Sequence, residues 1–169
     1  MNYQVNQTKA LNQAEIKALH AVLERSNQRD ATLLWVLLHT GCRASEALNL
    51  RIQDFDPRGR TLFIQGLKGS NDREIPIPNW LAKLVAVQAT VNSTHIFPIS
   101  YQRLNQLWLH YRPAKKKLHS LRHSFGIHLY RKTKDMKLVQ LALGHKNITN
   151  TLVYVDFCYS QQEMRRLIR

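Results

Sequence analysis

Two arginines, a lysine, two histidines and a tyrosine lie beside expected helix ends and turns, where side chains can reach a ligand. Arginine guanidinium groups can fork onto the two non-bridging oxygens of a phosphodiester. A tyrosine can act as a covalent nucleophile, and a lysine or histidine can move the protons. These residue types therefore suit an attack on a phosphodiester without a metal ion. The six candidates are Arg43, Lys68, His119, Arg122, His145 and Tyr154.

The local sequence gives each candidate a position where the chain turns or a helix begins. Arg43 follows a glycine and a cysteine at the start of an expected helix, and Lys68 lies beside Gly69 at an expected hairpin tip. His119 and Arg122 are three residues apart at the start of another helix. Such positions leave side chains accessible for binding and chemistry.

The last two candidates follow a helix end marked by Gly144. His145 comes directly after this glycine, and Tyr154 lies nine residues later on a short segment that we expect to be exposed. The spacing alone leaves open whether the six side chains meet in space.

Helix caps and hydrophobic periodicity predict the elements that must position these residues. Asn12 and Glu15 form a capping-box pattern at the start of a first helix. The run 33–38 is apolar on every side, so the helix over about 31–40 should be central and buried. The period then changes, and 61–64 and 73–77 read as paired strands. Further helices are predicted over 45–50, 80–90, 101–111, 121–133, 137–143 and 161–168, with a short segment over 149–155. The fold class predicted is α+β, mostly α, with a small antiparallel β-hairpin sheet.

The charge balance indicates a polyanionic partner. The chain has 169 residues with 25 lysines and arginines against 11 acidic residues, which gives a formal net charge of +14. Nucleic acid is the leading partner class, ahead of an anionic membrane and an acidic protein. No apolar run reaches the length of about 18 residues that a membrane-spanning helix needs. Two cysteines are too few for a disulfide scaffold or a zinc finger.

Four short motifs in order, with a hairpin lysine between the first two, resemble the catalytic domain of the tyrosine recombinases, the phage integrase family. The resemblance covers roughly residues 10–160. The motifs are Thr40-Gly41-Cys42-Arg43-Ala44-Ser45-Glu46, then Lys68-Gly69, then His119-Ser120-Leu121-Arg122-His123, then Leu143-Gly144-His145, and finally Tyr154.

The resemblance implies a role for each candidate in site-specific DNA recombination. Tyr154 would attack the scissile phosphate and form a 3′-phosphotyrosine link, which frees a 5′-hydroxyl. Arg43 and Arg122 would hold the non-bridging oxygens, and His145 would donate a further hydrogen bond to them. Lys68 would protonate the departing 5′-oxygen. His119 would assist as an acid or base around the tyrosine.

The resemblance also implies what the reaction requires and where it occurs. The phosphotyrosine conserves the bond energy, so no cofactor, metal ion or ATP is expected. Double-stranded DNA would be the partner, bound by a protein that is monomeric in solution and tetrameric on paired sites. The expected location is the cytoplasm of a bacterial cell. Integration, excision and inversion are equally compatible with these motifs.

Residues outside the six candidates receive other expectations. We expect Arg73 and the run Lys115, Lys116 and Lys117 to contact DNA phosphates or to remain solvated. Glu46 is expected to pair with nearby basic residues, and His123 to be a buried, hydrogen-bonded structural residue that faces away from the site. His119 and His123 could suggest zinc, but no third ligand lies at a suitable spacing.

Two other functions remain open on the sequence. A DNA-binding regulator could retain the recombinase fold without catalysis, and a type IB topoisomerase shares the chemistry but relaxes DNA by strand rotation. Most tyrosine recombinases carry a DNA-binding domain before the catalytic domain, whereas here we expect only an N-terminal segment over 1–11 before a catalytic domain over 12–158. The sequence therefore resembles the short recombinases that consist of the catalytic domain, and a fragment or a remnant in a mobile element is equally compatible with it. A C-terminal helix over 159–169 would, by the same resemblance, pack onto a neighbouring protomer.

Overall fold

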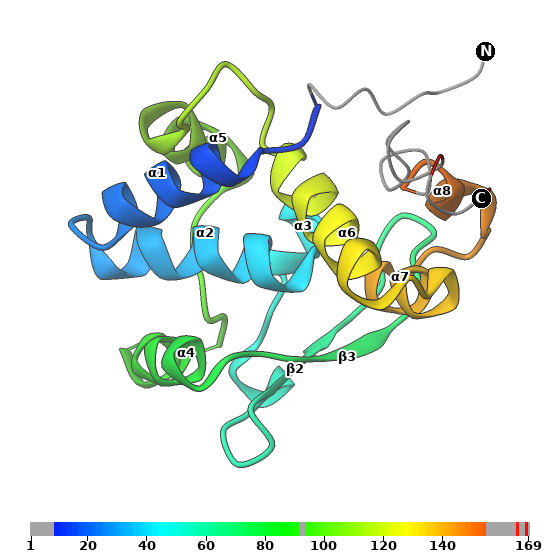
Figure 1. Ribbon diagram of the computed structural model, residues 1–169. Helices are drawn as coiled ribbons and strands as arrows, with labels where there is room; N and C mark the ends of the chain where they lie inside the picture. Colours follow the sequence, from blue (N-terminus) through cyan, green and yellow to red (C-terminus); the bar gives the residue numbers. More distant parts are fainter. Residues whose placement is uncertain (1–8, 92–93, 155–164, 166–167, 169) are drawn as a thin grey trace.

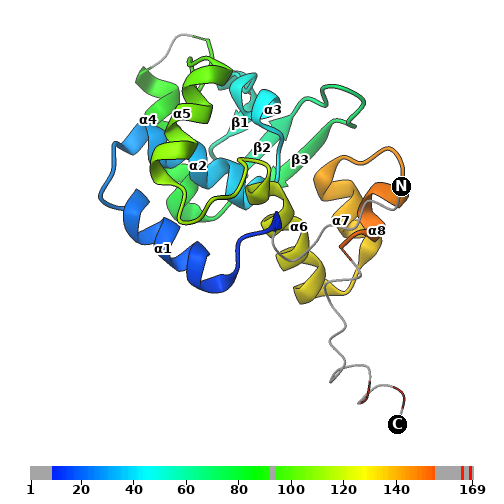
Figure 2. The same ribbon diagram turned by 90° about the horizontal axis from the view of Figure 1, so that it is seen from above.

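Helix α2 (Gln28–Thr40) forms the centre of the structure, a computed structural model that describes residues 9–91, 94–154, 165 and 168. Leu34 and Val36 are fully buried, and α1 (Gln13–Leu23), α4 (Asn79–Val91) and α6 (Ser120–Thr133) pack around α2 (Figures 1 and 2). A helix that is apolar on every side is stable only when neighbours cover all of its faces. The predicted central helix is therefore confirmed.

The start of α1 is fixed by reciprocal hydrogen bonds. The Asn12 side chain accepts from the Glu15 backbone N–H at 2.8 Å, and the Glu15 carboxylate accepts from the Asn12 N–H at 2.8 Å, as the capping-box pattern predicts. The preceding Leu11 N–H donates to the Ser124 hydroxyl on α6 at 2.8 Å. The N-terminal end of α1 is therefore fastened to the helix that carries Arg122.

Three antiparallel strands form the small sheet, in the order β1 (Phe55–Asp56), β2 (Thr61–Ile64) and β3 (Arg73–Pro76). Leu62 on β2 opposes Ile75 on β3, and both are buried. Phe63, the next residue along β2, is exposed. This alternation is that of a sheet with one face on the core. The β2–β3 hairpin was predicted from the sequence. Strand β1 was not, because two residues are too few to show a period.

The remaining elements are short or peripheral. They are α3 (Ala44–Leu48), the 3₁₀ turn η2 (Ile52–Asp54), α5 (Tyr101–Tyr111), α7 (Met136–Leu143) and α8 (Thr149–Leu152). The predicted C-terminal helix lies almost wholly outside the described residues. Within the part of the chain that the structure describes, no helix is long and apolar enough to cross a membrane.

Helix α6 lies between two hydrophobic clusters, and this position explains how it can carry reactive side chains in a rigid setting. Its one side packs against α2, and its other side packs against α7 (Figure 2). One of the two clusters, called the second hydrophobic cluster below, consists of Ala10, Ile127, Tyr130, Val139, Leu143 and Tyr154. The first turn of α6, with Arg122, is held from both sides.

Candidate active site

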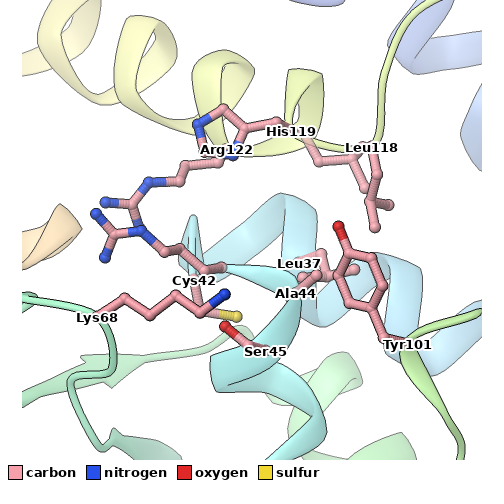
Figure 3. Close-up of a pocket in the computed structure, with 11 residues that line it drawn as sticks. Leu37, Cys42, Ala44, Ser45, Lys68, Tyr101, Leu118, His119 and Arg122 are labelled. Carbon is pink, nitrogen blue, oxygen red and sulfur yellow. The ribbon is translucent and has the colours of Figure 1, made fainter. Parts of the chain in front are cut away.

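Four of the six candidate residues line one cavity of about 290 Å³. Arg43 lies at the start of α3, Lys68 in the loop after β2, and His119 and Arg122 at the start of α6. Figure 3 shows Lys68 reaching towards the cavity from the loop, with His119 and Arg122 on the helix across from it. The remaining lining residues are Leu37, Cys42, Ala44, Ser45, Tyr101, Leu118 and Leu121. The cavity is therefore small and largely apolar in its lining, with cationic groups contributed by three separate segments.

Arg122 is held by the ends of two helices. Its guanidinium donates to the carbonyl oxygens of Gly41 at 2.6 Å and Leu143 at 2.7 Å, which lie at the C-termini of α2 and α7. Helix C-termini carry partial negative charge and favour a cation. Burial and the nearby Arg43 charge lower the pKa of Arg122 to about 10, so the group remains charged at neutral pH. The structure thus presents a buried, oriented positive charge.

Glu46 holds the arginines together. Its carboxylate accepts from Arg73 at 2.7 Å, from the Arg43 guanidinium at 3.2 Å and from the Arg43 backbone N–H at 2.7 Å. Arg122 lies 3.9 Å away. Burial by itself raises the pKa of Glu46, but the hydrogen bonds from Arg73 and Arg43 and the nearby positive charges lower it to about 2. The predicted pairing of Glu46 with basic residues is confirmed.

Replacement of Glu46 by glutamine is expected to lower the free energy of unfolding by about 3–5 kcal/mol, because buried guanidinium groups lose their counter-charge. The pKa of about 2 in the folded protein lies below the ordinary value of 4.5. The stabilisation by Glu46 is therefore complete above about pH 5 and is lost as the pH falls towards 2. Urea unfolding at pH 7 and pH 3 should show this loss in the parent and not in Glu46→Gln.

Glu24→Gln is the matched control for that measurement, because Glu24 is exposed at the end of α1. An exposed carboxylate contributes at most about 1 kcal/mol. Equal stabilities of Glu46→Gln and Glu24→Gln at pH 7 would contradict the assigned role of Glu46.

The loop that carries Lys68 is anchored to the segment that carries His145. The Asn71 N–H donates to the carbonyl oxygen of Gly144 at 2.9 Å, and Ser70 forms an antiparallel bridge with His145. The Ser70 hydroxyl also accepts a hydrogen bond from the Arg43 guanidinium. Residues from three distant motifs are therefore tied together by this loop, although Lys68 itself remains exposed.

His119 lies at the rim of the cavity as the residue before α6. Partial burial, followed by the charges of Arg122 and Arg43, lowers the pKa of His119 to about 4. The imidazole is therefore neutral at neutral pH and can accept a proton. Its ring meets that of His123 edge-on, with the ring centres 4.7 Å apart.

His145 is buried and does not line the cavity. Its Nδ1 lies 2.9 Å from the Thr151 hydroxyl, which fixes the ring against α8. Burial and then the charges of Arg122 and Arg43 lower the pKa of His145 to about 3. The ring is therefore neutral and held in one orientation.

Tyr154 is also buried, with 2% of its surface exposed, and does not line the cavity. Its ring lies parallel to that of His145, with the centres 6.4 Å apart, and its hydroxyl lies 3.3 Å from Nδ1 of His123. The expectation of an exposed segment at Tyr154 is wrong. The reason is that the chain after α8 packs its tyrosine into the second hydrophobic cluster, against α6 and α7.

Two of the residues expected at a DNA-contacting surface have other partners. Arg73 is buried, and besides binding Glu46 it donates to the carbonyl oxygen of Ala142 at 2.9 Å. Lys116 donates to the Ala10 carbonyl oxygen at 2.7 Å and pairs with Glu15 at 2.5 Å. Both side chains therefore join segments of the protein, in contrast to the expected position at the surface.

The other two lysines of that run are exposed. Lys117 lines a second cavity of about 360 Å³ beside the first, and the two cavities share Tyr101, Leu118 and His119. The concave surface thus continues from the candidate site along α5. Lys115 and Lys117 thus lie at the surface, and their contact with DNA phosphates stays a prediction.

Sequence reasoning missed three residues that shape the site. Ser70 contacts Arg43, Tyr101 lines both cavities, and Thr151 fixes His145. Each lies in an ordinary turn or helix-start sequence, and only the tertiary fold brings it to the site. His123 is buried and hydrogen-bonded as predicted, but it contacts Tyr154 and does not face away from the site.

Among residues 9–91, 94–154, 165 and 168, no group of three or more His, Cys, Asp or Glu side chains is arranged to hold a metal ion. The only cysteine in those ranges, Cys42, is free and buried.

Residues 9–160 match the model of the phage integrase family. The chain belongs to the phage integrase family. This match spans all six candidate residues, and it confirms the tyrosine recombinase catalytic domain that the motifs predicted.

Similar proteins support the same fold. The chain is 29% identical to the tyrosine recombinase XerA of Thermococcus kodakarensis, over 95% of this chain and 64% of that protein. It matches the catalytic domain of bacteriophage HP1 integrase with a TM-score of 0.71 and 25% identity, over 93% of this chain and 92% of that one. It also matches the XerH recombinase in a post-cleavage complex with palindromic difH DNA, with a TM-score of 0.73 and 25% identity, over 98% of this chain and 55% of that one.

The fold class is thereby confirmed as mostly helical with a small antiparallel sheet. The chain spans about two thirds of the length of XerA and about half of XerH. The predicted domain limits at 11 and 158 and the bacterial origin stay predictions.

Proposed function

We propose that this protein cuts and rejoins DNA strands at specific sites, through a covalent link between Tyr154 and a 3′-phosphate. The observation that carries the proposal is the convergence of Arg43, Lys68, His119 and Arg122 on one cavity, with Tyr154 contacting His123, whose ring meets the lining residue His119. The relative XerH has been captured with difH DNA after cleavage. The net charge of +14 favours a duplex as the substrate.

The arginines would bind the scissile phosphate. A guanidinium has five N–H donors, and two carbonyl oxygens engage only two of those of Arg122, so it retains donors for phosphate oxygens. Arg43 is partly exposed at the cavity, with 29% of its side chain accessible. Together the two groups would stabilise the charge that develops on a five-coordinate phosphorus.

The chemical step would exchange one phosphorus–oxygen bond for another. The Tyr154 oxygen forms a bond to phosphorus while the bond from phosphorus to the 5′-oxygen breaks. Lys68 gives a proton to the leaving oxygen, and neutral His119 takes the proton of the phenol. His145, which contacts Thr151 through Nδ1, would donate to the phosphate through Nε2. A 5′-hydroxyl from a second strand reverses the step and completes the exchange.

This assignment requires the tyrosine to move. With 2% of its surface exposed, Tyr154 cannot meet a phosphate in the position seen here. We therefore propose that binding of DNA shifts the segment after α8 so that the phenol enters the cavity. The fold already places the phenol beside the same helix, α6, that carries Arg122.

The proposal extends to requirements and partners. The arginines supply the charge stabilisation and the lysine the proton, so the reaction needs neither a metal ion nor ATP. Lys115 and Lys117 would contact phosphates flanking the site. By analogy with the family, the protein would be a monomer in solution and a tetramer on two paired duplexes, in the cytoplasm and associated with DNA, as part of a mobile element.

Capture of a covalent adduct tests this function. The full chain is incubated with a pool of nicked duplexes of randomised sequence in the presence of EDTA, and protein–DNA adducts that survive denaturation are isolated and sequenced. We expect adducts that share a common sequence and form without added metal or ATP. Salt-sensitive binding without any adduct would contradict the proposal and favour a non-catalytic regulator.

A further inference from the structure

We propose that His123 is a positioning residue, which holds the hydroxyl of Tyr154 in its buried place and out of the cavity lined by Arg43 and Arg122. This inference rests on the proposed function, because it assigns a device that governs the nucleophile of that reaction. The proposal gives His123 a role in controlling the nucleophile, beyond the structural role that the sequence predicted for it.

The contact is direct. Nδ1 of His123 lies 3.3 Å from the Tyr154 hydroxyl, at the long end of hydrogen-bond distances, and both residues are buried. The ring centres are 6.0 Å apart. Burial and then the charges of His119 and Arg122 lower the pKa of His123 to about 4, so at neutral pH its imidazole is uncharged and Nδ1 can accept from the phenol O–H.

The surrounding helix is shaped to receive the phenol. A Cβ atom on Gly126 would lie 2.9 Å from two ring carbons of Tyr154, closer than side chains tolerate. The absence of a side chain at Gly126 therefore lets the ring lie flush on α6, one turn from His123. On the opposite side, His145 stacks parallel to the ring.

His123 also connects the phenol to a residue of the cavity wall. Its ring meets His119 edge-on at 4.7 Å, and His119 lines the cavity whereas His123 and Tyr154 do not. The phenol is thus held outside the cavity, and His123 separates its hydroxyl from the lining residue His119. Attack on a phosphate requires the hydroxyl to leave Nδ1 of His123.

Nitration of tyrosines with tetranitromethane tests whether His123 holds the Tyr154 hydroxyl in the free protein, and peptide mapping resolves Tyr154 from the other tyrosines. The variants are His123→Leu, which removes Nδ1, and His123→Asn, which keeps a hydrogen-bonding atom near its position. We expect nitration of Tyr154 to rise by about 2- to 10-fold in His123→Leu, the range that one hydrogen bond supports, and to stay near the parent level in His123→Asn. Tyr101, which is exposed, and Tyr130, which is buried, report full access and an intact fold.

Single-turnover adduct formation gives the second readout. We expect the maximal rate in His123→Leu to rise by a similar factor, with the DNA concentration for half-maximal rate unchanged. Unchanged nitration of Tyr154 in His123→Leu, or an equal rise in His123→Asn, would overturn the proposal. A fall in the maximal rate would overturn it too, because it would place His123 in the chemical step.

Nitration of the buried Tyr130 would show that His123→Leu fails to fold. For that case, a second measurement needs no substitution at position 123. The ¹⁵N resonance of His123 Nδ1 is compared between the parent and Tyr154→Phe. We expect this resonance to move when the hydroxyl is removed, and an unmoved resonance would overturn the proposal. The nitration and resonance results stand even if no adduct forms, so failure of the proposed function is distinguishable from failure of the role proposed for His123.

Discussion

Replacement of Arg43 by alanine is expected to slow formation of the covalent adduct by about 10²–10³-fold, with DNA binding weakened much less. Loss of one preorganised donor to a developing oxyanion typically has this effect on rate. Arg43 lies at the cavity with its guanidinium held by Glu46 and Ser70, so its orientation is set before DNA arrives. Arg73 continues to pair with Glu46 in the variant, so the fold should persist. Single-turnover rates at saturating DNA give the measurement.

Two further variants sharpen this test. Arg43→Lys keeps the charge but loses the fork of two donors, and we expect it to recover only part of the rate. Arg58→Ala removes an exposed arginine from the turn between β1 and β2 and should react like the parent. Equal rates for Arg43→Ala and Arg58→Ala would remove Arg43 from the site.

Replacement of Lys68 by alanine is expected to slow cleavage by about 10²–10⁴-fold, the contribution typical of a positioned general acid. Lys68 is exposed in a loop anchored to Gly144 and His145, so its amine can reach a leaving oxygen at the cavity without disturbing the core. A substrate with sulfur in place of the bridging 5′-oxygen needs no proton to leave. We therefore expect this substrate to restore cleavage by Lys68→Ala to near the parent rate.

The matched control is Lys83→Ala, since Lys83 is exposed on α4. It should cleave both substrates like the parent. If sulfur substitution fails to rescue Lys68→Ala, then Lys68 acts by binding the phosphate and is not the acid.

Local patterns predicted the elements that carry the site. Asn12 and Glu15 placed the start of α1, because a capping box involves residues only three apart. The strand-like segments 61–64 and 73–77, with a turn-rich segment between them, gave the β2–β3 hairpin and so the loop of Lys68. The motifs around Arg43 and Arg122 gave two helix starts that the structure brings to one cavity. Each of these signals is contained in a few neighbouring residues.

Features that depend on distant partners could not be predicted in the same way. Arg73 binds Glu46, which lies 27 residues earlier, and Lys116 binds Glu15 across about a hundred residues. A basic side chain shows no sign in sequence of whether its partner is a carboxylate or a phosphate. Tyr154 follows a helix of four residues, too short to show which face is buried, and its place depends on space left by Gly126.

Identification of the residue joined to DNA tests the central claim most directly. Adduct isolated from the full chain is digested, and the peptide that carries a nucleotide is sequenced by mass spectrometry. We expect a nucleotide linked through its 3′-phosphate to Tyr154, and no adduct from Tyr154→Phe, whereas Tyr111→Phe, at the end of α5 and outside the cavity, reacts like the parent. A link to another residue, or undiminished adduct from Tyr154→Phe, would contradict the claim.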